Sequence, residues 1–288
     1  MQSEIKYVLI TGASTGVGRA TAITLSKNGY HVFAGVRNEQ DGQALRKLSQ
    51  QIEPIILDVT KAEDIENAFR LVSEKCGNNG LYALINNAGI NYIDPFENTQ
   101  EERARYLMEV NFFGMCKMMQ TFLPLLRLAT KDGTAKIVNL SSIGGAIGLP
   151  WESYYHGAKF AVLGMSEALR FEFRKQNVYV SCIMPGGIKT DFMTKLKSDV
   201  NKSLSNLKPE NPAYYKTGLE TMIKASEQFG DKIATTPEKV AGTVLKILSK
   251  RKPTFKFVIG IDGKMMYFMS KFIPSTDRHM LLRGQFGA

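Results

Sequence analysis

A glycine-rich turn near the beginning of the chain constrains its fold more than any other feature. The apolar run Ile5–Ile10 leads directly into TGASTGVG at residues 11–18, and a helical pattern, Arg19–Asn28, follows. Glycines let the backbone approach a pyrophosphate, and a helix start offers free N–H groups. This unit predicts a dinucleotide site, although its spacing is GxxxGxG rather than the commoner GxGxxG. Its residues are Gly12, Ser14, Thr15, Gly16, Val17 and Gly18.

The rest of the chain continues this alternation of strands and helices. Helical patterns cover Asp41–Gln50, Ala62–Lys75 and Thr99–Thr130. We predict an α/β fold, a single Rossmann-type domain over residues 1–288, with a doubly wound parallel sheet of about seven strands and helices on both faces. Ligands of such sheets bind beyond the carboxyl ends of the strands. The further strands are Tyr30–Val36, Pro54–Val59, Leu81–Ile85, Ala135–Leu140, Val178–Ile183 and Thr254–Ile259.

The end of the second strand predicts which dinucleotide binds. NAD sites usually carry an acidic residue there, which holds the adenosine ribose hydroxyls. This chain has Val36 followed by Arg37. Because no carboxylate repels a 2′-phosphate and a guanidinium is present to pair with it, we predict NADP(H). NAD(H) is the alternative, in which Arg37 is merely exposed at a strand end.

The end of the third strand carries Asp58, which has two interpretations. Its carboxylate is placed to accept a hydrogen bond from the adenine amino group. It is equally suited to cap the helix that begins near Ala62, a role that also fits Thr60.

The stretch NLSSIGGAIGLPWESYYHGAK, residues 139–159, holds the groups that predict the chemistry. Ser142 stands at the end of the fifth strand, and Tyr155 and Lys159 lie four residues apart on one face of the next helix. We expect the lysine to stabilise the phenolate and to lower the pKa of Tyr155, so that the tyrosine exchanges a proton near neutral pH. Tyr154 lies off this face and is expected to pack.

The long helical pattern Thr99–Thr130 contains two residues that disturb a helix. Asn111 interrupts the apolar line and needs hydrogen-bond partners if it is buried. Pro124 is expected to kink or end the helix nearby.

Composition excludes several classes of protein. No apolar run is long enough to span a bilayer, and the N-terminal residues have no readable signal peptide, so we expect a cytoplasmic protein. Cys76, Cys116 and Cys182 lie far apart among apolar neighbours and are interpreted as reduced thiols. The three histidines have no metal-ligand spacing, so no metal site is predicted. The net charge of +10 comes without a nucleic-acid-binding motif, so no nucleic-acid partner is predicted.

Two segments depart from the sheet pattern. Residues 191–236 have scattered apolar positions and no strand pattern, and an insertion of this size is typical of a substrate lid. The tail, residues 264–288, begins with KMMYFMSKFI, an apolar stretch between lysines. It is expected to cover the substrate mouth, to pack in a dimer, or to rest on a membrane surface, with packing preferred.

The motifs together resemble those of the short-chain dehydrogenase/reductase family over nearly the whole chain. They are TGASTGVG, Asp58-Val59, NNAG at residues 86–89, Asn111, Ser142, Tyr155-x-x-x-Lys159, and Pro185-Gly186 with Thr190. The stretches FAGVRN, SSIGGAIGLP and YYHGAKFA are similar to the branch of hydroxysteroid and retinol dehydrogenases and their bacterial relatives.

The resemblance implies a role for each matching residue. Tyr155 is the general acid or base, Lys159 tunes it and holds the nicotinamide ribose, and Ser142 donates a hydrogen bond to the substrate oxygen. Asn111 kinks its helix so that a main-chain carbonyl holds a water, which links Lys159 to solvent. Asp58, Val59, Asn87, Ala88 and Gly89 line the adenosine side, and Pro185, Gly186, Ile188 and Thr190 seat the nicotinamide carboxamide.

The resemblance also implies a reaction and partners. We expect hydride transfer between NADP(H) and the carbonyl or secondary alcohol carbon of an apolar substrate, such as a steroid, a retinoid or another lipid. A homodimer or homotetramer through the helices that hold Asn111 and Tyr155 is expected by analogy. The alternative function is a dinucleotide-binding redox sensor or scaffold without turnover.

Overall fold

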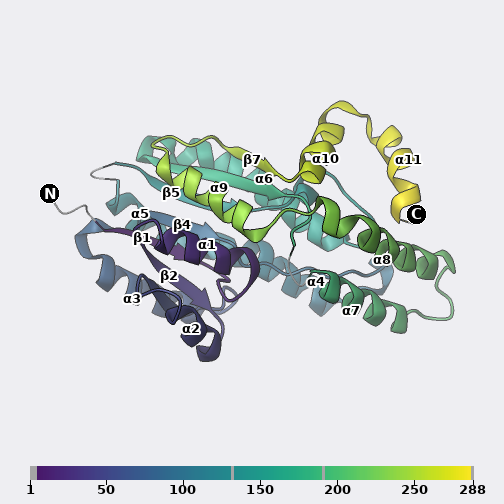
Figure 1. Ribbon diagram of the computed structural model, residues 1–288, viewed down its shortest axis with the longest axis horizontal. Helices are drawn as coiled ribbons and strands as arrows, with labels where there is room; N and C mark the ends of the chain where they lie inside the picture. Colours follow the sequence, from purple (N-terminus) through teal and green to yellow (C-terminus); the bar gives the residue numbers. More distant parts are fainter. Residues whose placement is uncertain (1–4, 131–132, 190–191, 287–288) are drawn as a thin grey trace.

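A parallel sheet of seven strands lies at the centre of the molecule, in the order β3-β2-β1-β4-β5-β6-β7 (Figure 1). The computed structural model describes residues 5–130, 133–189 and 192–286. The reversal of strand order between β1 and β4 creates the crevice at which ligands bind in open α/β sheets. The strands are β1 (Lys6–Ile10), β2 (Tyr30–Val36), β3 (Ile52–Ile56), β4 (Ala83–Asn86), β5 (Ala135–Leu140), β6 (Val178–Pro185) and β7 (Lys256–Ile259).

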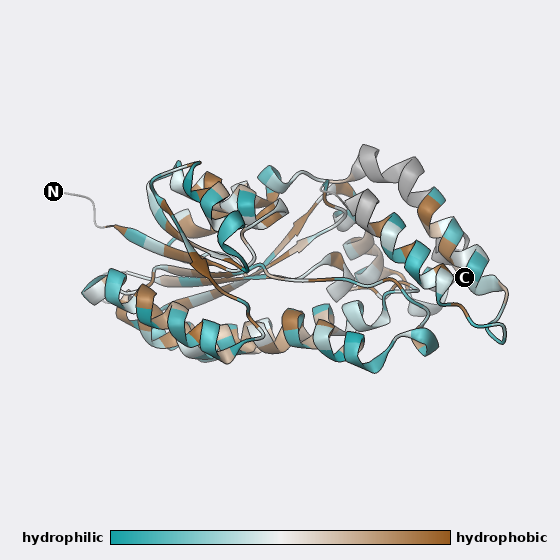
Figure 2. Cartoon of the chain, turned by 90° about the horizontal axis from the view of Figure 1, so that it is seen from below, coloured by the Kyte–Doolittle hydropathy of each residue, from teal (hydrophilic) through white to brown (hydrophobic). Residues whose placement is uncertain are grey.

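Helices cover both faces of the sheet, because its strands are apolar on both sides. Along β1, Leu9 faces one core and its neighbours Val8 and Ile10 face the other. Viewed from below, the apolar strands lie between helices whose outer surfaces are largely polar (Figure 2). One face carries α1 (Gly16–Ser26), α2 (Glu39–Arg46) and α9 (Pro237–Ser249), and the other carries α3 (Ala62–Cys76), α5 (Gly114–Leu128) and α6 (Ser153–Phe173).

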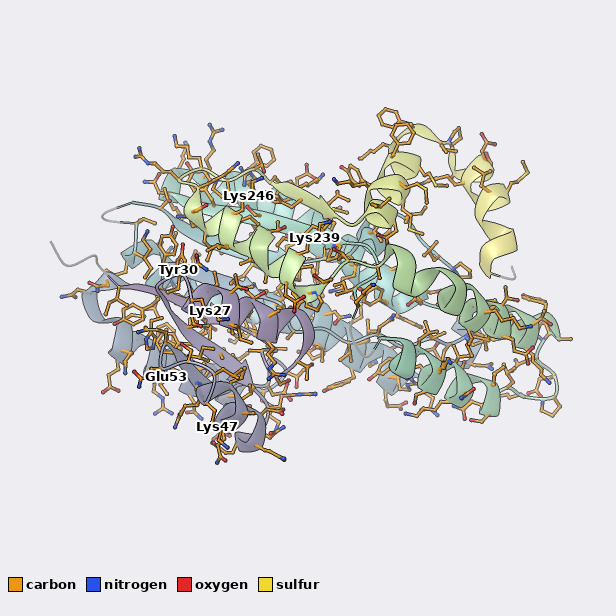
Figure 3. The ribbon with its side chains drawn as sticks, in the orientation of Figure 1. Lys27, Tyr30, Lys47, Glu53, Lys239 and Lys246 are labelled. Carbon is orange, nitrogen blue, oxygen red and sulfur yellow. The ribbon has the colours of Figure 1, made fainter. Side chains whose placement is uncertain are left out.

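Helices α1 and α9 pack against each other although they lie far apart in the sequence. Leu25 of α1 shares a buried core with Val244 and Ile247 of α9. Tyr82, just before β4, donates a hydrogen bond of 2.6 Å to the carbonyl of Leu248. Lys239 and Lys246 lie exposed on the outer side of α9 and contribute to the basic surface (Figure 3).

The predicted fold class is confirmed, with strand boundaries that shift by a few residues. β2 and β5 have the predicted bounds, whereas β3 begins and ends earlier than predicted. The side chain of Asp58 accepts hydrogen bonds from the N–H and hydroxyl of Thr60, at 3.0 and 2.8 Å, and this turn takes the chain out of the sheet. Pro54 is tolerated because β3 is an edge strand.

The long predicted helix is divided by a wider turn. It consists of α4 (Glu101–Met108), a π-helical segment (Glu109–Phe113) and α5. Pro124 lies inside α5, which ends shortly after it, at Leu128. Pro124 is exposed, and so is Gln120, whose carbonyl loses its helical partner.

The segment 191–236 contains two helices, α7 (Phe192–Ser205) and α8 (Tyr214–Ile233), which the sequence pattern did not predict. They form a small core of their own with Ile93 and Trp151, to which they contribute Leu196, Val200, Leu219 and Met222. The base of the segment is closed by a parallel bridge between Ile188 and Thr235.

The tail also forms two helices, α10 (Ile261–Phe272) and α11 (Ser275–Phe286). Met266, Tyr267 and Met269 of α10 pack against Ile143 and Ile147, which follow β5. Among the described residues, no helix combines the length and the apolar character needed to cross a bilayer. Short 3₁₀ turns occupy Gly77–Asn79, Phe96–Asn98, Ile143–Gly145 and Arg174–Gln176.

Candidate active site

The turn between β1 and α1 has the geometry of a phosphate cradle. Gly12 and Gly16 have φ angles of 65° and 54°, which glycine adopts without strain. A Cβ on Gly18 would lie 2.1 Å from the carbonyl oxygen of Gly12. α1 begins at Gly16, earlier than predicted, and has no acidic residue in its first turn. Its first N–H groups therefore point into the turn, where an anion is stabilised by the helix dipole.

Thr11 joins this turn to the NNAG segment, a role that the sequence reasoning missed. Its hydroxyl accepts hydrogen bonds of 3.0 Å from the N–H groups of Asn87 and Ala88. The side chain of Asn87 donates to the carbonyls of Thr11 and Gly12, at 3.0 and 2.9 Å. The glycine turn and the end of β4 are thus held together as one rigid wall, and the threonine in TGASTGVG was the available sequence signal.

The residues predicted for the adenosine half lie at neighbouring strand ends. Arg37 is exposed directly after β2, while Val36 is buried. The cap interpretation of Asp58 is wrong, because its carboxylate bonds to Thr60, and α3 starts after Lys61 without a side-chain cap. Thr60 is likewise not the cap. The adenine contact of Asp58 stays a prediction.

Ser142, Tyr155 and Lys159 are brought together at the carboxyl end of β5. The hydroxyl of Ser142 accepts a hydrogen bond of 3.1 Å from the N–H of Gly144 and is hydrogen-bonded to Tyr155. The Lys159 ammonium lies 5.5 Å from the centroid of the Tyr155 ring and donates to the carbonyl of Leu140 at 3.0 Å. Tyr154 packs as expected, stacked on Phe96.

The electrostatics of this group differ from the sequence-based expectation. Burial raises the pKa of Tyr155 to about 12, the hydrogen bond with Ser142 lowers it in part, and the charge of Glu152 raises it. Burial lowers the pKa of Lys159 to about 8. The expectation that Lys159 brings the phenol pKa toward neutrality is therefore wrong for the polypeptide by itself.

Asn111 lies inside the π-helical segment and is fully buried. Its side-chain oxygen accepts from the N–H of Ile90, and its amide donates to the carbonyl of the same residue, both at 2.8 Å. These two bonds satisfy the asparagine and fix the loop that follows NNAG. A Cβ on Gly89 would lie 3.2 Å from the Asn111 oxygen and 3.5 Å from the Lys159 ammonium, so the three residues adjoin.

The loop after β6 is held by an aspartate that the sequence reasoning missed. Asp262, in the first turn of α10, accepts a hydrogen bond of 2.6 Å from the N–H of Gly187. A Cβ on Gly186 would lie 2.2 Å from the same carboxylate. Pro185 ends β6, and Ile188 belongs to the bridge with Thr235. Thr190, predicted to contact the cofactor, lies outside the described residues.

A comparison with known protein families shows to which family the chain belongs. A family model described as short chain dehydrogenase matches residues 6–201. The chain belongs to the short-chain dehydrogenase family. It is therefore an oxidoreductase, as the resemblance of its motifs implied.

Known relatives of this short-chain dehydrogenase span nearly its whole length. It is 31% identical over 286 residues to a 3-ketodihydrosphingosine reductase of Bacteroides thetaiotaomicron, covering 98% of each chain. It is 37% identical over 282 residues to the mouse (Mus musculus) estradiol 17-beta-dehydrogenase 2, covering 94% of this chain and 72% of the relative. A short chain dehydrogenase from Burkholderia cenocepacia in complex with NADP matches with a TM-score of 0.69 at 25% identity, covering 98% and 99% of the two chains.

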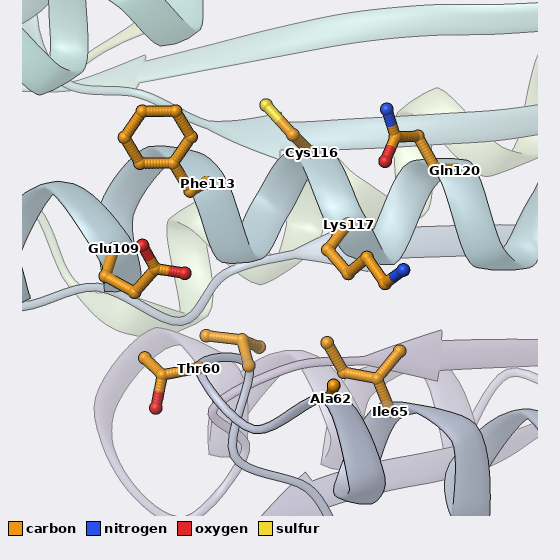
Figure 4. A pocket seen from close by; sticks show the side chains of 9 residues that line it. Thr60, Ala62, Ile65, Glu109, Phe113, Cys116, Lys117 and Gln120 are labelled. Atoms are coloured by element: carbon orange, nitrogen blue, oxygen red, sulfur yellow. The ribbon is translucent and has the colours of Figure 1, made fainter.

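A separate groove of about 400 Å³ lies between the start of α3 and the helix pair formed by the π-helical segment and α5 (Figure 4). Glu109 and Lys117 extend over it toward Thr60 and Ile65. Of the residues predicted for the dehydrogenase site, the lining contains only Val59. The residues predicted to be catalytic therefore do not line this groove. No cluster of His, Cys, Asp and Glu side chains suited to a metal ion occurs in the described part of the enzyme.

Proposed function

We propose that this short-chain dehydrogenase transfers a hydride between NADP(H) and the carbonyl or secondary alcohol carbon of an apolar substrate, with Tyr155 as general acid or base. One observation carries the proposal. A serine hydroxyl and a tyrosine phenol are hydrogen-bonded at a strand end, with a buried ammonium 5.5 Å from the ring. That arrangement suits proton transfer to an oxygen whose carbon exchanges a hydride.

Each catalytic side chain has a distinct part in this reaction. With a pKa of about 12, Tyr155 stays protonated at neutral pH and suits the role of acid when a ketone is reduced. Ser142 donates a hydrogen bond to the substrate oxygen, which matters most as negative charge develops there. Lys159 supplies positive charge beside the phenolate that forms. NADP(H) supplies or accepts the hydride, while the chain orients it.

The cofactor preference rests on Arg37. The cradle at Gly12, Gly16 and Gly18 fits the pyrophosphate, and the exposed guanidinium after β2 is placed for a 2′-phosphate. We expect wild type to bind NADPH more tightly than NADH and Arg37→Asp to erase or reverse this preference in a fluorescence titration. Arg46→Asp, an equal charge change on the exposed side of α2, is expected to keep it. Equal affinity of wild type for both cofactors would contradict the role of Arg37.

An apolar substrate is supported by the surroundings of the catalytic group. Ile143, Ile147 and the inner face of α10 form an apolar wall directly after Ser142. Residues 191–236 act as a lid, since α7 and α8 pack on Trp151, four residues before Tyr155. Relatives named for 3-ketodihydrosphingosine and estradiol support a bulky, lipid-like molecule. The NADP-bound relative supports the cofactor.

The test of the reaction is a panel of ketones and aldehydes with NADPH. Tyr155→Phe removes the proton donor and is expected to lower kcat by at least about 10²-fold. Tyr154→Phe is the matched control, because its hydroxyl belongs to a neighbouring ring that stacks on Phe96. Full activity of Tyr155→Phe, or no reduction by wild type, would overturn the proposal.

Two surfaces support finer proposals about assembly and location. Tyr106, Phe113, Phe160 and Phe171 are exposed on the helices that hold Asn111 and Tyr155, so we place a homodimer or homotetramer interface there. Sedimentation is expected to give wild type a mass above the 32.1 kDa of one chain, and Phe160→Glu is expected to weaken the assembly.

The location that we propose is the cytoplasm, because the three cysteines are free and a reducing compartment keeps thiols reduced.

The outer face of α10 supports peripheral contact with an anionic membrane. Ile261, Met265, Phe268 and Phe272 recur at helical spacing and are 57–76% exposed. Lys264 and Lys271 flank them. The inner face of the same helix covers the wall beside Ser142, so α10 would lead an apolar substrate from the lipid to the active site.

A further inference from the structure

Three polar side chains beside the catalytic tyrosine form what we call the Glu152 cluster: Asn91, Glu152 and His156. Asn91 lies in the loop after β4, Glu152 immediately precedes α6, and His156 follows Tyr155 directly. The Asn91 amide donates a hydrogen bond to one oxygen of Glu152, and the His156 Nε2 lies 3.8 Å from the other. None of the roles derived above for Ser142, Tyr155 and Lys159 uses this cluster.

The cluster contains more acceptors than donors. His156 Nδ1 lies 2.9 Å from the carbonyl oxygen of Gly144, and because a carbonyl only accepts, Nδ1 carries the proton. In the neutral ring Nε2 is then an acceptor. The amide of Asn91 is engaged with Glu152, which leaves its oxygen as a second acceptor. Both atoms are buried and have no hydrogen-bond partner in the described chain. A buried acceptor without a donor destabilises the fold by its lost hydration, so a bound group that donates hydrogen bonds to these two atoms would be stabilised.

The cluster is placed where part of a substrate would lie. Glu152 is the N-cap residue of α6, three residues before Tyr155. The carboxylate is near enough to raise the pKa of Tyr155. Its side chain retains 12% exposure, whereas His156 beneath it retains 7%. Trp151, at φ 70°, turns the chain so that its own side chain enters the core of α7 and α8 while Glu152 contacts Asn91.

We propose that the Glu152 cluster binds a hydrogen-bond-donating group, a hydroxyl or an ammonium, that the substrate carries next to its reacting carbonyl carbon. The proposal rests on the reaction proposed above, since it names a second recognition point of the same site. Glu152 lies three residues from Tyr155 and its charge acts on the phenol, so the group belongs close to the carbonyl carbon. A carboxylate and two neutral acceptors complement either donor.

The first test compares three ketones that share one apolar chain: the plain ketone, its α-hydroxy derivative and its α-amino derivative as a salt. We expect wild type to prefer at least one donor-bearing ketone about tenfold or more in kcat/KM with NADPH, because a site built around a donor rejects the analogue without it. A stronger preference for the amine assigns the selectivity to the charge of Glu152. A stronger preference for the alcohol assigns it to the neutral acceptors, Asn91 and His156. Equal kcat/KM values for all three ketones overturn the proposal, whatever the variants do.

The second test uses Glu152→Gln, which keeps the shape and removes the charge. We expect the preference for the α-amino ketone over the plain ketone to fall toward one. Glu167→Gln is the matched control, an identical change on the exposed side of α6 near Lys256, and is expected to keep the wild-type preference. If Glu152→Gln lowers kcat/KM for all three ketones by the same factor, the carboxylate only holds the Asn91 loop, and the proposal fails.

A binding measurement separates this proposal from the reaction itself. Trp151 is the single tryptophan of the chain and directly precedes Glu152, so its fluorescence reports on the site. Titration of wild type is expected to show tighter binding of the donor-bearing ketones than of the plain ketone. Selective binding without turnover of any ketone would overturn the proposed reaction and support this recognition site. Equal binding of all three would overturn the site.

Discussion

At the residue scale, Lys159 shows a conflict between catalysis and stability. Burial lowers its pKa from 10.5 to about 8, so the folded state binds this proton more weakly than the unfolded state does. The buried ammonium therefore destabilises the folded state. This destabilisation is fully present below pH 8, amounts to about 3 kcal/mol at neutral pH, and disappears as the pH rises from 8 toward 10.5.

Replacement of Lys159 by Met is therefore expected to abolish activity while raising the free energy of unfolding at pH 7 by about 1–3 kcal/mol, after loss of the hydrogen bond to Leu140. The gain should shrink between pH 8 and 10.5. Urea unfolding across this range measures it, with exposed Lys175→Met as the control. A difference that does not change with pH would contradict the lowered pKa.

Ser142 acts on the pKa of Tyr155 in the direction opposite to burial. Its hydrogen bond lowers the pKa of Tyr155, so Ser142→Ala is expected to raise that pKa further. The pH at which alcohol oxidation becomes fast should move upward, and kcat should fall about 10²-fold as the donor to the substrate oxygen is lost. A pH–rate profile measures both effects, with exposed Ser153→Ala as the control. An unmoved profile would place Ser142 out of contact with Tyr155.

At the element scale, α10 holds the loop after β6 through one carboxylate. Asp262→Ala removes the charged acceptor for the N–H of Gly187, and such bonds contribute about 1.5–3 kcal/mol. We expect the Kd for NADPH to rise about tenfold and the Tm to fall. Asp262→Asn, which retains a neutral acceptor, should lie between wild type and Asp262→Ala, and Asp277→Ala on the exposed side of α11 should match wild type. An unchanged Kd in Asp262→Ala would separate this bond from cofactor binding.

The elements also show what the sequence could and could not predict. Strands such as Tyr30–Val36 and Ala135–Leu140 were predicted to the residue, because both faces of a parallel strand are buried and their sequences are largely apolar. The π-helical segment at Asn111 was predicted only as a kink, since its pattern is helical on both sides. α7 and α8 were missed because each buries a narrow stripe against distant residues, Ile93 and Trp151.

The site divides in the same way. Spacing alone predicted that Tyr155 and Lys159 lie side by side, because residues four apart share one face of a helix. It did not give the pKa values, which depend on desolvation by several elements. Nor did it find Asp262 or the Glu152 cluster, whose partners lie 75 and 61 residues away in the chain.

At the scale of the whole molecule, the charge and the outer face of α10 predict binding to anionic vesicles. Wild type is expected to sediment with vesicles that contain phosphatidylglycerol. Salt is expected to release it, because salt screens the attraction of Lys264 and Lys271 to the anionic lipids. Phe268→Glu should remove the binding. Leu71→Glu, a similar change at a partly exposed position of α3, should not. Equal sedimentation of wild type and Phe268→Glu would exclude α10 as the contact.

The packing of α1 against α9 has a consequence for how the chain is made. During translation the phosphate turn leaves the ribosome long before the helix that covers α1, which begins at Pro237. Until then α1 packs on strands of the sheet, and the part of its apolar side that packs against Val244 and Ile247 stays uncovered. A nascent chain with such late contacts folds slowly and exposes sticky surface meanwhile. The growing chain is therefore expected to bind the dinucleotide only after α9 has been made, although the phosphate turn is made long before it.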